Sequence, residues 1–233
     1  MANALVTGAT SGIGRAIALG LHDAGHRVTA VGRDPAALAE LAARGLVPLA
    51  ADVTADTGAL ADTDPEILVN NAGLMPPLGN FADLDPSEIA PAIALNLTAA
   101  LTVTRAVLPA MRARGKGHIF FTGSTAGHAP FANLALYAAT KAAIGGFARS
   151  LRLDLAPLGI RVTEIVAGRV ETSLYRDRLP LETRAAMYAG GGAVQPQDVA
   201  AMVLAVLALP QNVDVARFDI LPMQSPTATG TKG

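Results

Sequence analysis

The chain has 233 residues, of which 51% are hydrophobic and 16% charged, so it has enough apolar material for a core and does not resemble a disordered chain. Its net charge of -1 argues against nucleic acid or an anionic membrane surface as a partner. It contains no cysteine, which excludes disulfides, thiol nucleophiles and cysteine metal sites and fits a reducing cytoplasm. At about 150 residues per domain the length corresponds to one or two domains, and we expect one.

No targeting segment or membrane span is expected. The apolar run that opens at Ala4 meets Gly8 at once and has no basic start. The longest uninterrupted apolar run, residues 199–209, is much shorter than the about 18 residues of a membrane span. We therefore expect a soluble protein located in the cytoplasm.

Short apolar runs alternate along the chain with longer helical patterns, and this alternation is typical of a parallel sheet whose crossovers are helices. The expected strands span residues 4–7, 27–31, 47–50, 67–70, 118–122, 161–166 and 215–221. The expected helices span residues 13–24, 35–44, 88–114, 136–158 and 196–209. The pattern predicts an α/β protein in which residues 1–233 form one Rossmann domain, a seven-stranded parallel sheet with helices on both faces.

Proline and aspartate mark several helix boundaries. Asp34-Pro35 and Asp85-Pro86 each combine a capping residue with proline at the first helical position, so both predict a helix start. Pro91 and Pro109 lack the amide hydrogen that a helix interior needs, which predicts a late start near Pro91 and a kink near Pro109.

Two segments are expected to carry little regular structure. About fifteen residues separate Ala51 from Ile67, close to the minimum for a parallel crossover, so this connection holds at most a short helix. Residues 225–233 are small and polar, and we expect a flexible tail.

A glycine-rich segment joins the first strand to the first helix. Glycines allow a tight turn and close approach to a pyrophosphate, and the free amides at a helix start stabilise the anion. The alternative is a purely structural role as a tight strand-to-helix turn, but the position of the segment after the first strand favours dinucleotide binding. The expected cofactor contacts in this loop are Gly8, Thr10, Ser11, Gly12, Ile13 and Gly14.

The end of the second strand bears on the choice of cofactor. A Rossmann site places an acid there for the ribose 2′-hydroxyl, or an arginine for a 2′-phosphate. Gly32 supplies no acid and Arg33 follows it, so we expect Arg33 to pair with the 2′-phosphate and NADP to be preferred over NAD. The alternative is a solvated arginine beside Asp34.

Four polar residues form the candidate catalytic set. Tyr137 and Lys141 are four residues apart, hence on one face of a helix, and a nearby cation lowers the pKa of a phenol toward the range of a general acid/base. Ser124 follows the fifth strand, at the sheet edge where ligands bind, and its hydroxyl is placed to orient a substrate carbonyl. Asn96, in the preceding helix, is expected to hold a water or to brace the backbone. The alternative for Tyr137 and Lys141 is a surface pair of little consequence.

Together these residues resemble the short-chain dehydrogenase/reductase family over essentially the whole chain. Residues 7–14 are similar to the family's cofactor loop, Asp52-Val53 to its adenine contact, and Asn70-Asn71-Ala72-Gly73 to its sheet-stabilising motif beside the cofactor. The four catalytic positions of the family match in identity, order and spacing; they are Asn96, Ser124, Tyr137 and Lys141.

The resemblance implies a role for each catalytic residue. Tyr137 would exchange a proton with the substrate oxygen, which Ser124 would hold. Lys141 would lower the pKa of the tyrosine and bind the nicotinamide ribose, and Asn96 would position a water of the proton relay. Asn70, Ala72 and Gly73 are carried over as further cofactor contacts, together with Tyr137 and Lys141.

The segment after the sixth strand carries both a match and a departure. The family's Pro-Gly is Ala167-Gly168 here, followed by Val170 and Thr172, which would contact the nicotinamide carboxamide. Residues 169–194 occupy the place of the family's substrate lid. We expect one of its arginines to bind a substrate carboxylate, with solvated arginines as the alternative; they are Arg169, Arg176, Arg178 and Arg184.

The resemblance implies an NADP-dependent oxidoreductase acting on a secondary alcohol, a ketone or a small hydroxy acid, and a homo-oligomer, a tetramer or a dimer. Residues 104–111, 123–127 and 218–225 are most similar to NADP-dependent 3-hydroxy acid dehydrogenases of the serine type. The alternatives are a catalytically silent NAD(P)-binding regulator and a lyase or epimerase on the same scaffold. No metal is expected, since His22 and His26 lack an evident third ligand.

Overall fold

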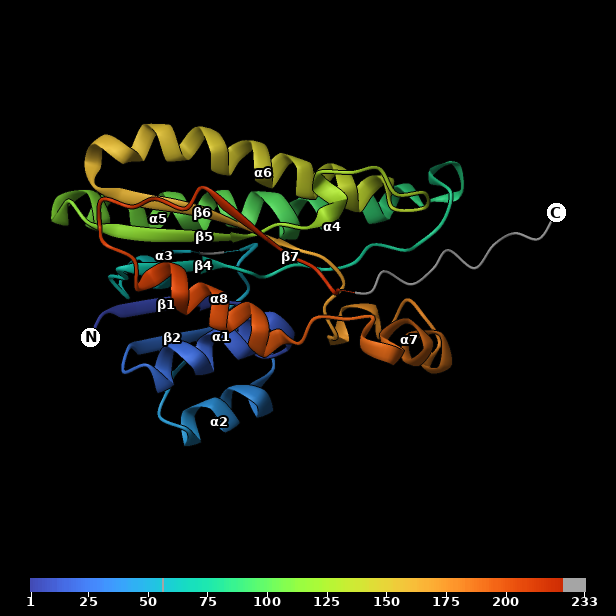
Figure 1. The fold of residues 1–233 in the computed structure, drawn as a ribbon, viewed down its shortest axis with the longest axis horizontal. Coiled ribbons are helices and arrows are strands. Elements are labelled where there is room, and N and C mark those ends of the chain that lie inside the picture. The colour runs from blue at the N-terminus through green and yellow to red at the C-terminus, as the bar shows by residue number, and fades with distance from the viewer. Residues whose placement is uncertain (56, 224–233) are drawn as a thin grey trace.

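The computed structural model describes residues 1–55 and 57–223, which form a parallel sheet covered on both faces by helices (Figure 1). The strand order is β3-β2-β1-β4-β5-β6-β7, and every neighbouring pair is parallel. The predicted seven-stranded Rossmann sheet is confirmed. The predicted tail, residues 225–233, lies outside the described residues. The strands are β1 (Asn3–Thr7), β2 (Arg27–Gly32), β3 (Val47–Ala50), β4 (Ile67–Asn70), β5 (Gly117–Thr122), β6 (Ile160–Ala167) and β7 (Arg217–Ile220).

The helices pack two apolar clusters against the sheet, one on each face. Helices α1, α2 and α8 contribute to the first cluster, and α3, α5 and α6 contribute to the second. The helices are α1 (Gly12–Asp23), α2 (Pro35–Ala43), α3 (Gly58–Ala61), α4 (Ile89–Ile93), α5 (Ala99–Arg114), α6 (Ala135–Leu155), α7 (Leu181–Tyr188) and α8 (Pro196–Leu207). Six 3-10 turns accompany them in the described chain: Phe81–Asp83, Pro86–Glu88, Thr125–Gly127, Ala156–Leu158, Ser173–Tyr175 and Ala189–Gly191.

The predicted capping residues act as caps. The Asp34 carboxylate accepts hydrogen bonds from the amides of Ala36 and Ala37, and Asp85 accepts one from Ser87. The short connection after β3 holds only α3, a helix of four residues, as expected.

The expected late helix start near Pro91 is wrong. Helix α4 begins at Ile89, before Pro91, because the first turn of a helix tolerates the missing amide hydrogen. Pro109 lies inside α5, where a kink or curvature is expected, and a π-helical turn at Ala94–Thr98, which carries Asn96, precedes this helix. Within the described residues, Pro86–Arg114 is the one helical run long and apolar enough to cross a membrane; Val103, Val107 and Met111 of this run are buried in the core.

Side-chain hydrogen bonds tie together the carboxyl ends of β1, β4 and β5. The buried Thr7 Oγ1 accepts from the amides of Asn71 and Ala72, at 3.0 and 3.1 Å, and donates to the Val69 carbonyl. The Asn71 side chain donates to the carbonyls of Thr7 and Gly8, and its Oδ1 accepts from Thr122 Oγ1. The loops that follow these three strands are therefore fixed relative to one another.

We expect Thr7→Val to lower the free energy of unfolding by about 2 to 3 kcal/mol, because the substitution leaves two amides without an acceptor in a buried place. Chemical denaturation would measure the change. Thr29→Val on β2 is the matched control, since the Thr29 hydroxyl has no recorded hydrogen bond among the described residues; a similar loss in both variants would contradict the assigned role of Thr7.

Candidate active site

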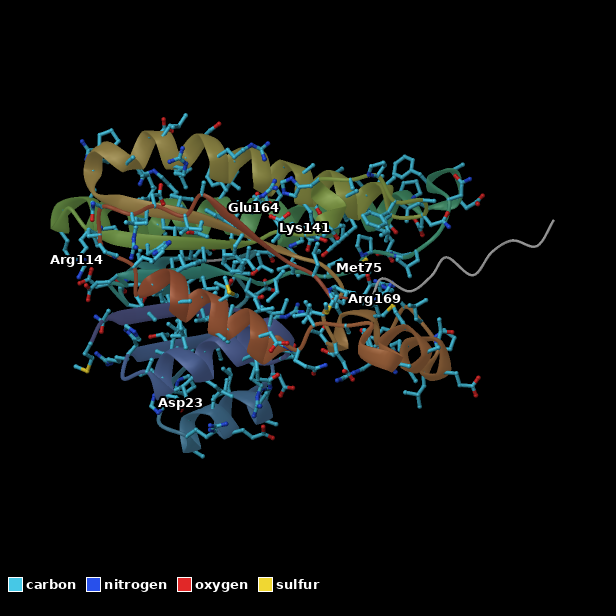
Figure 2. The ribbon with its side chains drawn as sticks, in the orientation of Figure 1. Asp23, Met75, Arg114, Lys141, Glu164 and Arg169 are labelled. Atoms are coloured by element: carbon cyan, nitrogen blue, oxygen red, sulfur yellow. The ribbon has the colours of Figure 1, made fainter. Side chains whose placement is uncertain are left out.

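A cleft of about 840 Å³ opens at the carboxyl ends of the strands, the edge at which open parallel sheets bind their ligands. Loops that follow β1, β2, β3, β4, β5 and β6 line it, together with residues 172–175, Asp177, Arg178 and Met187. Figure 2 shows Lys141, Met75 and Arg169 toward the end of the molecule that carries α7. Among the predicted cofactor contacts, those that line the cleft are Gly8, Thr10, Ser11, Gly12, Ile13, Arg33, Asp52, Val53, Ala72, Gly73, Tyr137, Lys141, Ala167, Gly168, Val170 and Thr172.

The glycine loop forms one wall of the cleft. Gly8 and Gly12 have φ of +65° and +52°, a left-handed conformation that side chains rarely adopt. Gly14 was predicted as a contact but is not among the lining residues. A Cβ atom there would lie 2.3 Å from both Asn71 Nδ2 and the Gly8 carbonyl oxygen, so this glycine allows the loop to pack on Asn71.

Arg33 and Asp52 form the outer rim beside Gly32. Arg33 Nη1 lies 3.7 Å from Asp52 Oδ2, and the arginine side chain is 73% exposed. Hydrogen bonds from the Thr54 amide and hydroxyl, with a smaller contribution from Arg33, hold the pKa of Asp52 below its usual range. Arg33 therefore pairs with Asp52 and not with Asp34, whose carboxylate caps α2.

Asn70 ends β4 and Asn71 follows it, and their side chains have different surroundings. Asn70, a predicted cofactor contact, is not among the lining residues; its amide donates to Thr104 Oγ1 on α5 at 2.9 Å. Asn71 lines the cleft instead.

Asn96 braces the loop behind the cleft. Its Oδ1 accepts from the Leu74 amide at 2.8 Å, and its Nδ2 donates to the Leu74 carbonyl and to Thr140 Oγ1. The side chain is 2% exposed and is not among the lining residues. Of the two roles expected for Asn96, the side chain has that of bracing the backbone.

Ser124, Tyr137 and Lys141 come together in the cleft. Ser124 follows β5, whereas Tyr137 and Lys141 lie in the first two turns of α6. Lys141 Nζ lies 5.7 Å from the centre of the Tyr137 ring and donates to the Thr122 carbonyl at 2.8 Å. The structure thus brings three of the four predicted catalytic residues to one place and puts Asn96 behind them.

Burial controls the charge of the tyrosine and the lysine. It raises the pKa of Tyr137 well above its usual range, with a further contribution from Tyr175, while a hydrogen bond with Ser124 acts in the opposite direction. Burial also lowers the pKa of Lys141 to about 8, against the attraction of Glu164. The expected lowering of the Tyr137 pKa by Lys141 is therefore wrong for the protein alone, because loss of water outweighs the neighbouring cation.

Residues 169–194, the expected substrate lid, are held in place by hydrogen bonds from arginine side chains. Arg169 Nη1 donates to the carbonyls of Met187 and Gly192, and Arg178 Nε donates to the Met75 carbonyl at 2.8 Å. Of the four arginines considered, Arg169 and Arg178 line the cleft, and Arg176 and Arg184 do not.

Sequence reasoning missed several residues of the site. Glu164 carried a signal, since a charged residue in the middle of an apolar strand needs a partner. Tyr175, beside Tyr137, had no recognisable signal because it lies in an irregular turn.

The comparisons with known proteins agree with this geometry. The family model for the short chain dehydrogenases matches residues 2–181. The chain is 47% identical to an uncharacterized short-chain type dehydrogenase/reductase of Sinorhizobium fredii, over 94% of this chain and 90% of the relative. It is 36% identical to the NADP-dependent 3-hydroxy acid dehydrogenase of Escherichia coli, over 94% of each.

A solved structure described as the closed form of serine dehydrogenase complexed with NADP+ superposes with a TM-score of 0.91, at 33% identity over 98% of each chain. The match covers the sheet, its helices and the cleft. The chain therefore belongs to the short-chain dehydrogenase/reductase family of oxidoreductases.

Proposed function

We propose that the protein is an NADP(H)-dependent oxidoreductase that transfers a hydride between nicotinamide and a secondary alcohol, a ketone or a small hydroxy acid. The observation that carries this proposal is the meeting of Ser124, Tyr137 and Lys141 in a cleft whose opposite wall is the glycine loop. A silent cofactor-binding regulator has no need of all these side chains. A lyase or epimerase would keep them, and net turnover of the cofactor separates it from an oxidoreductase.

The wall of the cleft fits a dinucleotide. Gly8 and Gly12 present backbone without side chains, and a Cβ at Gly12 would lie 3.1 Å from Thr172 Cγ2 across the opening. The start of α1 would hold the pyrophosphate through its amides and dipole. Arg33 would meet the 2′-phosphate, and Asp52 and Val53 the adenine. When bound, the nicotinamide supplies or accepts the hydride.

Proton transfer falls to this chain's own residues. Burial keeps Tyr137 a neutral phenol, so in the reductive direction its hydroxyl donates a proton to the substrate oxygen. Ser124, whose side chain lowers the pKa of Tyr137 against the effect of burial, orients that oxygen. The Lys141 ammonium stabilises the phenolate that forms, and Asn96 keeps the Leu74 backbone in place beside them.

The residues at the substrate end favour an anionic substrate. Arg178 uses only Nε on the Met75 carbonyl, and its two terminal nitrogens have no recorded partner in the described part of the chain. A guanidinium with free terminal nitrogens matches the two oxygens of a carboxylate. A small hydroxy acid, bound by Arg178 and reacting at Tyr137, is the substrate class that we infer. The family resemblance adds a homo-oligomer, a tetramer or a dimer, and the cysteine-free composition supports a cytoplasmic location.

We expect Tyr137→Phe to lower kcat/KM by about a thousand-fold while cofactor binding is retained, because only the proton donor is lost. A spectrophotometric panel of NADPH and NADH against ketones, keto acids and hydroxy acids would measure it. Activity that persists in this variant refutes the role of Tyr137. Tight cofactor binding without turnover across the panel favours the regulator.

Arg33→Ala is expected to weaken NADPH binding by about ten- to a hundred-fold and to leave NADH binding unchanged, since the variant loses one charge-assisted contact with a phosphate that NADH lacks. Fluorescence titration with both cofactors would test it. Arg15→Ala is the matched control, because Arg15 pairs with Glu40 and does not line the cleft. An unchanged ratio of the two affinities would refute the assignment.

Arg178→Leu is expected to raise KM for a 3-hydroxy acid by at least about ten-fold and to leave KM for a neutral secondary alcohol nearly unchanged, because only the acid carries the charge that Arg178 binds. Arg176→Leu is the neighbouring control, outside the cleft lining. An equal rise in KM for both substrates would assign Arg178 to holding the loop at Met75 alone.

A further inference from the structure

A buried carboxylate lies behind the proposed active site. Glu164 is the sixth strand's one acidic residue, is 1% exposed and lies on the sheet face covered by α6. Figure 2 shows it beside Lys141. A Cβ atom at Gly123 would lie 2.5 Å from Glu164 Oε1, and one at Gly145 would lie 2.9 Å from it. The carboxylate therefore fills the space that two glycines leave, one just before Ser124 and one a single turn after Lys141.

His128 holds this carboxylate in place through a hydrogen bond. Its Nε2 lies 2.8 Å from Glu164 Oε1, and its Nδ1 lies 3.4 Å from Arg217 Nη1. An arginine only donates, so Nδ1 must accept, and the imidazole hydrogen is then on Nε2 and is donated to Glu164. Arg217 is itself paired with Asp219 at 2.8 Å. A neutral imidazole leaves the negative charge of Glu164 available to another group.

Lys141 is the group that needs this charge. It is 5% exposed, and its recorded acceptor among the described residues is the Thr122 carbonyl. Glu164 is the charged group whose attraction raises the pKa of Lys141, against the larger lowering by burial. Glu164 Oε2 is buried and has no hydrogen-bond partner in the part of the chain described.

Among the residues that the structure describes, few other charged and titratable groups surround this pair. On α6 they are Tyr137 and Arg149, whose Nη1 lies 3.3 Å from the Cβ position of Gly145. After β5 there is His128, and on β7 there are Arg217 and Asp219, which pair with each other.

We propose that Glu164, held by His128, is a positioning residue that keeps Lys141 protonated and directed at the Thr122 carbonyl inside a buried site. The proposal rests on the function proposed above, in which the Lys141 ammonium stabilises the Tyr137 phenolate. His128 acts through Glu164, and neither residue lines the cleft.

The direction of the effect follows from the charges. Without the carboxylate, burial acts on Lys141 unopposed, and the ammonium loses its proton at a lower pH. A neutral amine does not stabilise a phenolate, so the alkaline limit of activity moves to lower pH as well. Glu164→Asp keeps the charge and is expected to keep most of the native behaviour.

The first test reads Lys141 directly, without cofactor. The chain has three lysines, so selective labelling with ¹³C-lysine gives few signals to follow in an NMR pH titration. We expect the Lys141 midpoint to fall by about one pH unit in Glu164→Gln and to stay near the native value in Glu164→Asp. His128→Ala removes the recorded partner of the carboxylate from a partly exposed position and is expected to shift the midpoint the same way by less.

Asp214→Asn is the matched control, since Asp214 pairs with Arg152, eleven residues and about 16 Å beyond Lys141 on α6. A Lys141 midpoint that is unchanged in both Glu164→Gln and His128→Ala, or equally shifted in Asp214→Asn, would overturn the proposal. If Glu164→Gln does not fold, the Lys141 midpoint in His128→Ala decides whether the proposal stands.

The second test is the pH dependence of kcat/KM with NADPH. The alkaline limb of the profile should move down by about one unit in Glu164→Gln and return in Glu164→Asp. A shifted Lys141 midpoint with an unchanged pH profile of kcat/KM would support the coupling of Glu164 to Lys141 and refute the role of Lys141 in the proposed function. Failure of the present proposal and failure of the proposed function are therefore distinguishable.

Discussion

The partly buried hydrogen bonds among Thr7, Asn71 and Thr122 are the constraint on which the cleft depends. They fix the loops after β1, β4 and β5 to one another, and these loops supply the glycine wall, the residues from Asn71 to Met75 and Ser124. Thr122 makes two hydrogen bonds in this network: its hydroxyl donates to Asn71, and its carbonyl accepts from Lys141 Nζ. The backbone that supports the cofactor wall thus also directs the lysine, and neither can shift without the other.

Exclusion of water determines the direction of the pKa shifts of Tyr137 and Lys141 in the cleft. The same burial that makes Tyr137 hold its proton makes Lys141 release its own more readily, so the proton affinities of the two groups, which are similar in free tyrosine and free lysine, are moved apart. A proton donor and a cation that both respond to small changes in nearby charge suit a reaction in which charge appears and disappears on one oxygen. Tyr175 therefore affects the pKa of Tyr137, and Glu164 affects the pKa of Lys141. The spacing of residues in the sequence indicates neither contact.

Local sequence patterns predicted the features that depend on neighbouring residues in the chain, such as strands, helix starts and helix faces. The apolar runs located all seven strands, the Asp-Pro pairs located two helix starts, and the spacing of Tyr137 and Lys141 located the face of α6 that lines the cleft. The failures have a common cause, which is that they depend on contacts between distant parts of the chain. Which of Asn70 and Asn71 lines the cleft depends on where β4 ends, and the direction of the Tyr137 pKa shift follows from how much water the fold removes.

Glu164 shows how a distant contact can still leave a trace in the sequence. Its carboxylate lies too close to the positions at which Gly123 and Gly145 would carry a Cβ atom, so an acidic residue in an apolar strand and two glycines on other elements are one structural feature. Any side chain at either glycine would displace the carboxylate from His128 or from the neighbourhood of Lys141. The glycine before Ser124 and the glycine one turn after Lys141 are therefore explained by the charge behind the active site, and the three residues are expected to change together if they change at all.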